Sequence, residues 1–158
     1  MARSLRDSGP SIGLLVLRVG IGGFLLSHGI GKLRLLLSGA SEGFDVIGLG
    51  AGTSLFLVTI AEFLCAILVM VGLATRPASA IVVLSMGVAA FVAHAANPWT
   101  MEKGYILYMS KAAESWASKE PALLFLIPML ALVFTGAGAF SIDAWIRRRW
   151  AARRTAAA

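Results

Sequence analysis

Residues 121–142 read PALLFLIPMLALVFTGAGAFSI, and none of these 22 residues carries a formal charge. A helix needs about 20 mostly apolar residues to cross the hydrocarbon core of a bilayer, so this run is long enough for one span. Residues 77–101 form a second uncharged run, of 25 residues. These two segments predict membrane-spanning helices and therefore decide the class of fold.

Two further apolar segments precede them. Residues 46–75 contain a single formal charge, Glu62, and residues 12–30 contain only Arg18. The segment nearest the N-terminus is the weakest span by hydropathy, because Lys32 and Arg34 follow it closely. We therefore predict an all-α integral membrane four-helix bundle, with helices at about 11–37, 52–74, 77–96 and 120–142.

The composition of the whole chain agrees with this class. Of its 158 residues, 58% are hydrophobic and 14% are charged, whereas a soluble domain averages about 45–50% apolar and about 25% charged residues. The formal net charge of +6 would suit a nucleic-acid-binding protein, but such a domain needs far more polar surface than this chain offers. The single cysteine, Cys65, excludes an intramolecular disulfide. We expect one domain over residues 1–158, with the lipid bilayer as a partner and no nucleic acid.

The distribution of Lys and Arg predicts the orientation of the bundle. With both termini cytoplasmic, eight of these residues lie on the inner side and five on the outer side, in line with the positive-inside rule. The basic cytoplasmic tail, residues 144–158, is interpreted as an anchor for anionic lipid head groups. No small-x-small cleavage site follows the first span, so we expect that span to be retained. The inner residues are Arg3, Arg6, Arg76, Arg147, Arg148, Arg149, Arg153 and Arg154, and the outer ones are Lys32, Arg34, Lys103, Lys111 and Lys119.

Residues 97–119 connect the third and fourth predicted helices on the outer side. At 100° per residue, an apolar stripe runs along one face, and Lys111 and Glu114 project from the other side. Such a pattern predicts a short helix lying in the membrane interface. This helix either covers the mouth of the bundle as a lid or only anchors the loop. The stripe consists of Tyr105, Tyr108, Met109, Ala112 and Trp116.

Charged residues inside a span are costly, at about 2.5–3.5 kcal/mol for a central Arg, Lys or Asp, and they usually pair. Arg18 and Glu62 differ by only about 7 Å in expected depth, at 1.5 Å per residue. We therefore predict that they pair within the membrane, either as a structural ion pair or as a site that binds a polar ligand or relays protons. Arg76 and Asp143 are expected to form a second, structural pair at the inner face.

The first helix places its polar residues and two glycines on one side. Arg18, His28 and Lys32 fall within about 80° of one another, at 100° per residue. Gly22 and Gly29 lie in or beside the same sector, and small residues let helices approach closely. This polar face is therefore also predicted to be the packing face of the helix.

Four polar residues are predicted to meet near the outer surface. His28 and His94 lie at about the same depth, and Lys32 and Glu120 lie just above them. The two histidines could bind a quinone carbonyl, handle protons, or simply be satisfied at the interface. Two histidines without a third ligand in a motif do not predict a metal or haem site. Lys32 and Glu120 are expected to form a salt bridge at the rim.

Five regions of the chain, in order and regularly spaced over residues 17–143, resemble membrane proteins of the DoxX family. Residues 100–118 look longer than the usual third connection of that family. The motifs are LR at 17–18 with SHGIGKL at 27–33, AE at 61–62 with GLATRP at 72–77, HAANPW at 94–99, KEPALL at 119–124, and TGAGAFSID at 135–143.

The resemblance implies a four-helix, multi-pass protein of the bacterial cytoplasmic (inner) membrane. Because the family takes its name from a membrane subunit linked to quinone-coupled sulfur oxidation, it also implies a subunit or accessory factor of a quinone-linked redox system. Such a protein would be catalytic only as part of a membrane oxidoreductase complex, with quinone as cofactor and other membrane or periplasmic redox proteins as partners. Carried over, the polar positions of the family fall on Arg18, His28, Lys32, Glu62, Arg76, His94, Glu120 and Asp143.

Two other functions stay open at this level. The small size and the absence of a cofactor motif also suit a non-catalytic membrane scaffold or assembly protein, and a homo-oligomer is compatible with either function. The intramembrane residues Arg18 and Glu62 would suit a small-solute or proton pathway.

Overall fold

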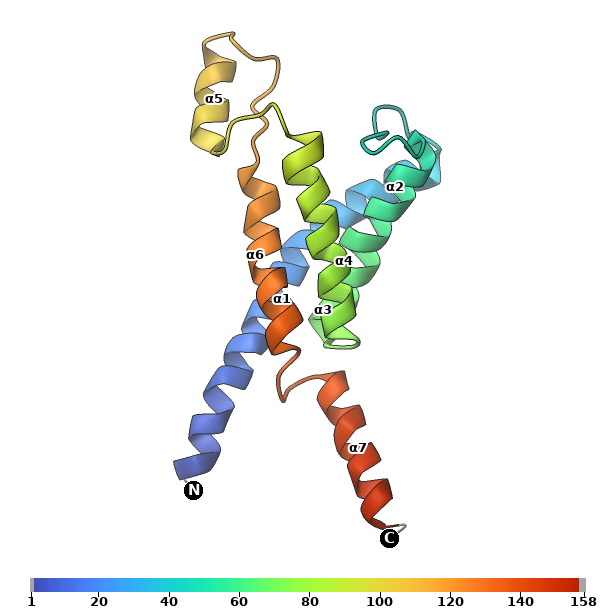
Figure 1. The fold of residues 1–158 in the computed structure, drawn as a ribbon, viewed down its shortest axis with the longest axis vertical. Helices are drawn as coiled ribbons and strands as arrows, with labels where there is room; N and C mark the ends of the chain where they lie inside the picture. The colour runs from blue at the N-terminus through green and yellow to red at the C-terminus, as the bar shows by residue number, and fades with distance from the viewer. Residues whose placement is uncertain (1, 157–158) are drawn as a thin grey trace.

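The computed structural model describes the backbone of residues 2–156 and the side chains of residues 9–156. All regular secondary structure in this part of the chain is helical (Figure 1). The side chains of Arg3 and Arg6, which enter the predicted orientation, lie outside the described residues. The described ends of the chain lie at one end of the molecule. We call that end proximal and the opposite end, formed by residues 39–50 and 94–119, distal.

Helix α1 (Ala2–Ser38) runs obliquely across the other helices (Figure 1). It packs against the second helical rod through its glycines: a Cβ atom at Gly29 would collide with the backbone of Glu62, and one at Gly22 would meet the side chain of Met70. The predicted packing face of this helix is therefore confirmed. Glycine is required at residue 29 because two backbones approach each other there more closely than any side chain allows.

The second rod consists of α2 (Ala51–Thr59), a π-helical turn η1 (Ile60–Leu64) and α3 (Cys65–Val71). It continues through a tight turn into α4 (Thr75–Val88), which ends in a second π-helical turn, η2 (Ala89–Ala93). The two rods form a hairpin, and their helix boundaries are close to those predicted. A π turn inserts one extra residue into a helix and occurs frequently at functional sites.

Among the described residues, three helical segments are long and apolar enough to cross a membrane: Gly9–Ser38, Ala51–Val71 and Thr75–Ala93. The predicted fourth helix, 120–142, is shorter than expected, because α6 (Glu120–Thr135) ends seven residues early. The helix ends at Gly136, whose φ of 72° lies outside the right-handed helical region. Glycine adopts this value without a steric cost. The 16 residues of α6 rise about 24 Å. The chain then turns into a separate helix, α7 (Ile142–Ala156).

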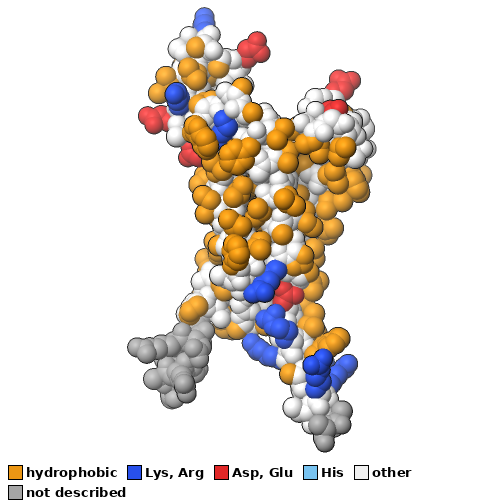
Figure 2. Space-filling view, viewed as in Figure 1, with side chains coloured by type: hydrophobic (Ala, Val, Ile, Leu, Met, Phe, Trp, Pro, Cys, Tyr) orange, Lys and Arg blue, Asp and Glu red, His pale blue; other side chains and the backbone are white. Residues whose placement is uncertain are grey.

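The core is made where α4 packs against α6 and where α1 packs against α3. Leu25, Val69, Val82 and Leu132 are among its fully buried side chains. Large apolar side chains also cover the outside of the bundle, and Figure 2 shows them over its middle, with charged groups gathered toward the two ends. Such a surface would be unfavourable in water and suits the hydrocarbon of a bilayer.

The distal connection contains a short helix, α5 (Met101–Met109), but not over the residues predicted for it. The helix begins after Thr100, whose side chain accepts a hydrogen bond from the backbone N–H of Lys103. It ends just before Lys111, which has a φ of 57°. The predicted stripe therefore breaks, and Trp116 lies in an irregular segment instead of on the helix.

Candidate functional site

A cavity of about 750 Å³ lies in the distal half of the bundle. Its walls come from α1, α2, η1, α4, η2 and α6, and the loop between α1 and α2 contributes Phe44, Val46 and Ile47. Most of the lining is apolar. The polar side chains on the wall are Ser54, Ser85, His28, Lys32, Glu62 and His94.

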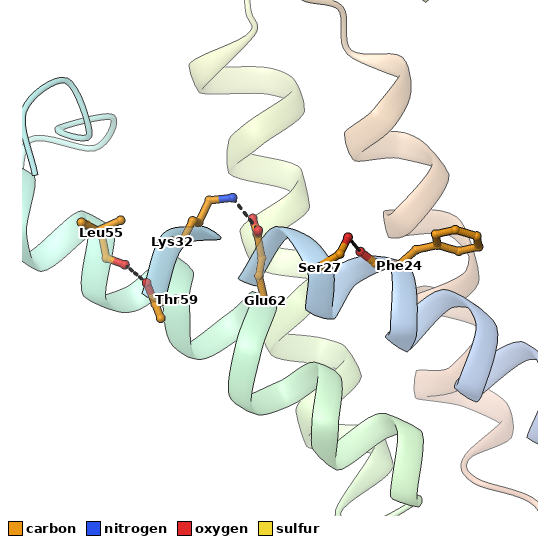
Figure 3. Close-up of polar contacts among 6 residues, drawn as sticks. All are labelled: Phe24, Ser27, Lys32, Leu55, Thr59 and Glu62. Carbon is orange, nitrogen blue, oxygen red and sulfur yellow. Dashed lines mark hydrogen bonds and ion pairs between the residues drawn. The ribbon is translucent and has the colours of Figure 1, made fainter. Parts of the chain in front are cut away.

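Glu62 provides the buried charge of this cavity. It lies on the π turn η1, and its carboxylate accepts a hydrogen bond from the ammonium of Lys32 on α1, with 2.5 Å between Nζ and Oε2 (Figure 3). The Glu62 side chain is only 6% exposed and that of Lys32 is 23% exposed. The close contact between Gly29 and the backbone of Glu62 brings the two rods together one helical turn before Lys32. Gly29 therefore makes the ion pair possible.

The predicted pair of Arg18 with Glu62 is wrong. The guanidinium of Arg18 is fully buried at the proximal end and donates hydrogen bonds to three backbone carbonyls. Nη1 lies 3.1 Å from the oxygens of both Val69 and Met70, and Nη2 lies 2.6 Å from that of Phe140. The last carbonyls of a helix have no partner within it, so Arg18 satisfies the end of α3 and ties it to the segment after α6.

Arg18 and Glu62 do not lie at similar depths, because α1 crosses the bundle obliquely (Figure 1), whereas the predicted depths assume a helix perpendicular to the membrane. Residue 29, not residue 18, lies beside Glu62. These two positions of α1 are separated by about 16 Å along its axis. Arg18 is therefore a structural clamp. Glu62, the carboxylate predicted to pair with it, pairs with Lys32 instead.

The two histidines reach the wall of the same cavity by different routes. His28 projects from α1 and is exposed, and its ring meets Phe125 edge to face at 5.6 Å between centroids. His94 is the first residue after η2, and its Nδ1 lies 2.9 Å from the side-chain amide nitrogen of Asn97. The structure thus places His28, Lys32, Glu62 and His94 around one cavity, and among them Lys32 and Glu62 are in direct contact.

Glu120 does not join this group, and the predicted rim pair of Glu120 with Lys32 is not formed. Its carboxylate accepts the backbone N–H of Met101, with 2.7 Å between Oε2 and N. A carboxylate is favourable there because the N-terminus of a helix carries unpaired N–H groups and a partial positive charge. Lys32 is held by Glu62 instead.

Lys119 supports the turn that follows His94, although in the sequence it stands out only as an outer positive charge and as part of the motif at 119–124. Its side chain is buried, and Nζ donates to the carbonyls of Ala95 and Asn97 at 2.8 Å each. The ammonium also lies 5.2 Å from the centre of the Trp99 ring. A lysine in a polar connection ordinarily points into solvent, so no sequence signal marked it as the support of the His94 turn.

At the proximal end, Asp143 and Arg76 do not pair as predicted. The carboxylate of Asp143 accepts the backbone N–H groups of Ala74 and Thr75, at 2.8 and 3.0 Å, and Arg76 donates to the carbonyl of Phe134. Burial alone would raise the pKa of Asp143, but these hydrogen bonds outweigh it and hold the pKa below its ordinary value. A structural link between α7 and the turn before α4 is therefore present, with backbone partners instead of Arg76.

A comparison with protein families identifies the chain. The DoxX family model matches residues 13–95, which is more than half of the sequence. The protein belongs to the DoxX family. No curated protein and no solved structure matches the chain. The resemblance to this family is thus confirmed, and with the three long apolar helices it establishes a DoxX-family membrane protein.

The DoxX match contains most of the cavity wall. It extends from α1 to the residue after His94, so it includes both histidines and the pair of Lys32 with Glu62. Glu120 and Asp143 lie beyond it. The part of α6 that closes the cavity, at Pro121, Ala122 and Phe125, also lies beyond the match.

The wall of this DoxX-family cavity offers hydrogen-bond donors, and its charged groups compensate each other. The ammonium of Lys32 and the carboxylate of Glu62 neutralise each other, and Ser54 has a buried hydroxyl with no hydrogen-bond partner among the described residues. Within that part of the chain, no three His, Cys, Asp or Glu side chains are grouped to hold a metal ion. The arrangement can hydrogen-bond a neutral polar group while apolar side chains surround the rest of a ligand.

Proposed function

We propose that this protein is the membrane subunit of a quinone-linked redox system and that its distal cavity holds the quinone head group. The observation that carries the proposal is a single cavity whose apolar lining also includes His28, His94 and the Lys32–Glu62 pair. Small-molecule sites typically measure about 300–1,000 Å³ and carry a few convergent polar groups on an apolar wall. A quinone head, with two carbonyl oxygens on an apolar ring, fits this description.

The charge balance of the wall supports a neutral ligand. Because Lys32 and Glu62 compensate each other, an anionic substrate would gain no net attraction and would lose its hydration. A quinone carbonyl needs only a donor, which the imidazole N–H groups, the ammonium of Lys32 or the hydroxyl of Ser54 can supply. These residues would therefore bind and orient the ring.

Exposed apolar residues in the lining support entry from the lipid. Leu57, Ile81 and Leu84 line the cavity and are exposed, Leu84 to 71%. In a bilayer these side chains would face hydrocarbon, so a ligand could enter laterally with an isoprenoid tail left in the lipid. A water-soluble substrate has no apolar tail to leave in the lipid, so a lateral entrance would not favour its binding.

In this proposal the protein has four spans in the bacterial inner membrane, with α6 as a short fourth span, cytoplasmic termini and a periplasmic distal end. The excess of Lys and Arg at the proximal end supports this orientation. Quinone supplies the two-electron chemistry when bound. The chain's own side chains hold the head group and exchange protons at Lys32 and Glu62, and a partner redox protein provides the electrons.

The test is quinone binding by the purified protein in lipid nanodiscs, measured with a short-chain ubiquinone. The double variant Lys32→Met/Glu62→Gln removes the polar pair without leaving a buried charge alone, and it should weaken binding about three- to tenfold, the worth of one or two hydrogen bonds. Arg76→Gln, at the exposed proximal end, is the matched control and should bind normally. Failure of the wild-type protein to bind quinone would overturn the proposal in favour of a scaffold.

A further inference from the structure

The turn after η2 holds one ring nitrogen of His94, and the other has no hydrogen-bond partner among the described residues. Nδ1 of His94 lies 2.9 Å from Nδ2 of Asn97. In the assigned orientation of the Asn97 amide its nitrogen faces His94 and can only donate, so Nδ1 is the acceptor of this hydrogen bond. A neutral imidazole whose Nδ1 is an acceptor carries its proton on Nε2.

The segment that presents Asn97 is itself held firmly. The backbone N–H of Asn97 donates to the carbonyl of His94 at 3.0 Å, which closes the turn. Lys119 then grips the same segment with three hydrogen bonds, from Nζ to the carbonyls of Ala95 and Asn97 and from its backbone N–H to that of Pro98. The backbone around Asn97 is therefore anchored on both sides, at Ala95 and at Pro98.

His28 provides the contrast. Its ring meets Phe125 edge to face, and within the described residues neither of its nitrogens has a hydrogen-bond partner. Nothing in its surroundings selects a tautomer. Of the two histidines on the cavity wall, only His94 has its proton position set by a neighbour, and its Nε2 has no hydrogen-bond partner among the described residues.

We infer that Asn97 is a positioning residue that holds His94 as the Nε2–H tautomer, so that His94 presents a fixed hydrogen-bond donor to the cavity ligand. The ligand group recognised there is a neutral oxygen acceptor, such as a carbonyl. This inference rests on the proposed function for the identity of the ligand, but the tautomer itself does not depend on it.

The tautomer can be observed directly by NMR. The chain has only two histidines, so ¹⁵N-histidine labelling of the full protein in nanodiscs gives two sets of ring signals, and the variant His28→Gln assigns them. In the ligand-free wild type we expect His94 to show a protonated Nε2 and an unprotonated Nδ1. A protonated Nδ1 with a free Nε2 would overturn the inference, whatever the protein binds.

Two substitutions of Asn97 separate this role from simple packing. Asn97→Asp keeps the shape but turns the donor into an acceptor, so at about pH 9, where an imidazole is neutral, the proton should move to Nδ1. Quinone affinity should then fall about ten- to a hundredfold, because an unprotonated Nε2 would face the carbonyl. Asn97→Ala removes the preference without reversing it, so a loss of at most about threefold is expected.

The order of the two variants is decisive. A packing role would make the smaller alanine worse than the isosteric aspartate, and this order would overturn the inference. A wild type that shows the Nε2–H tautomer but binds no quinone would remove the proposed function and leave the assignment of His94 as a donor standing. Both variants are compared with the wild type by circular dichroism and size-exclusion chromatography, and the wild-type spectrum alone suffices if either fails to fold.

Discussion

Lys32→Met is expected to destabilise the protein more than Glu62→Gln does, although both changes break the same ion pair. The asymmetry follows from the burial of the two side chains, of which Glu62 is 6% and Lys32 23% exposed. Removing Lys32 leaves a buried carboxylate with no counter-charge, which costs about 3–5 kcal/mol of unfolding free energy in comparable buried pairs. Removing the charge of Glu62 leaves an ammonium on a flexible stem, which can turn toward the distal surface.

The loss from Glu62→Gln is therefore smaller, about 1.5–3 kcal/mol, the value of one hydrogen bond to a charged group. The double variant Lys32→Met/Glu62→Gln has no unpaired charge left in the cavity wall. Its loss should not exceed that of Glu62→Gln alone. The two single losses are then non-additive, with a coupling energy at least as large as the loss from Lys32→Met, about 3–5 kcal/mol.

The free energies can be measured by reversible unfolding in mixed micelles of mild detergent and sodium dodecyl sulfate, followed by circular dichroism. Lys103→Met and Glu102→Gln are the matched controls, because both side chains are exposed on α5 and neither forms an ion pair in the described structure. Each should change the unfolding free energy by less than about 0.5 kcal/mol. Additive losses from the two single variants, or a larger loss from Glu62→Gln, would refute the reasoning.

Three further predictions use the same unfolding assay. Gly29→Ala should lose about 1–3 kcal/mol, because its Cβ would meet the backbone of Glu62, while Gly31→Ala, whose Cβ meets nothing, should lose none; equal effects would contradict the close approach. Arg18→Lys should cost about 1–3 kcal/mol, because one ammonium cannot reproduce the fork that reaches three carbonyls, and a neutral result would argue against the clamp. Asp143 has a lowered pKa, so its carboxylate stabilises the fold above the ordinary value of 3.8, and this contribution is lost as the pH falls from there through the lower folded value. Asp143→Asn should flatten the pH profile of stability in that acid range, and parallel profiles would exclude this link.

Much of the fold could be predicted because the relevant signals are local. The apolar runs marked the membrane segments, and their boundaries came within a few residues for the second and third spans. The glycines at 22 and 29 identified the packing face of α1, because helical periodicity alone decides which residues share a face. The fourth span was overestimated because Gly136 and Gly138 are apolar enough to extend a hydrophobic run while their backbone conformation ends the helix.

The residues of the candidate site could be predicted from the sequence, but the partner that each of them contacts could not. His28, Lys32, Glu62 and His94 were all singled out, and all line the cavity. Their partners were wrong, since Glu62 binds Lys32 and not Arg18. Lys119 and Asn97 fall within family motifs but were given no role in the site, because a polar connection gives no sign of which side chains turn inward.

The sequence by itself therefore determined that this is a membrane protein of helices, which face of α1 packs, and which few polar residues lie where water is scarce. Hydrophobicity, periodicity and short motifs carry that information residue by residue. Only the tertiary structure decided which charge meets which. The oblique crossing of α1 brings residue 29 beside Glu62, and the π turns and the early end of α6 shift the neighbouring side chains. Such crossings and turns shift side chains by a few ångströms, which is enough to change which charges pair. No local feature of the sequence indicates these shifts.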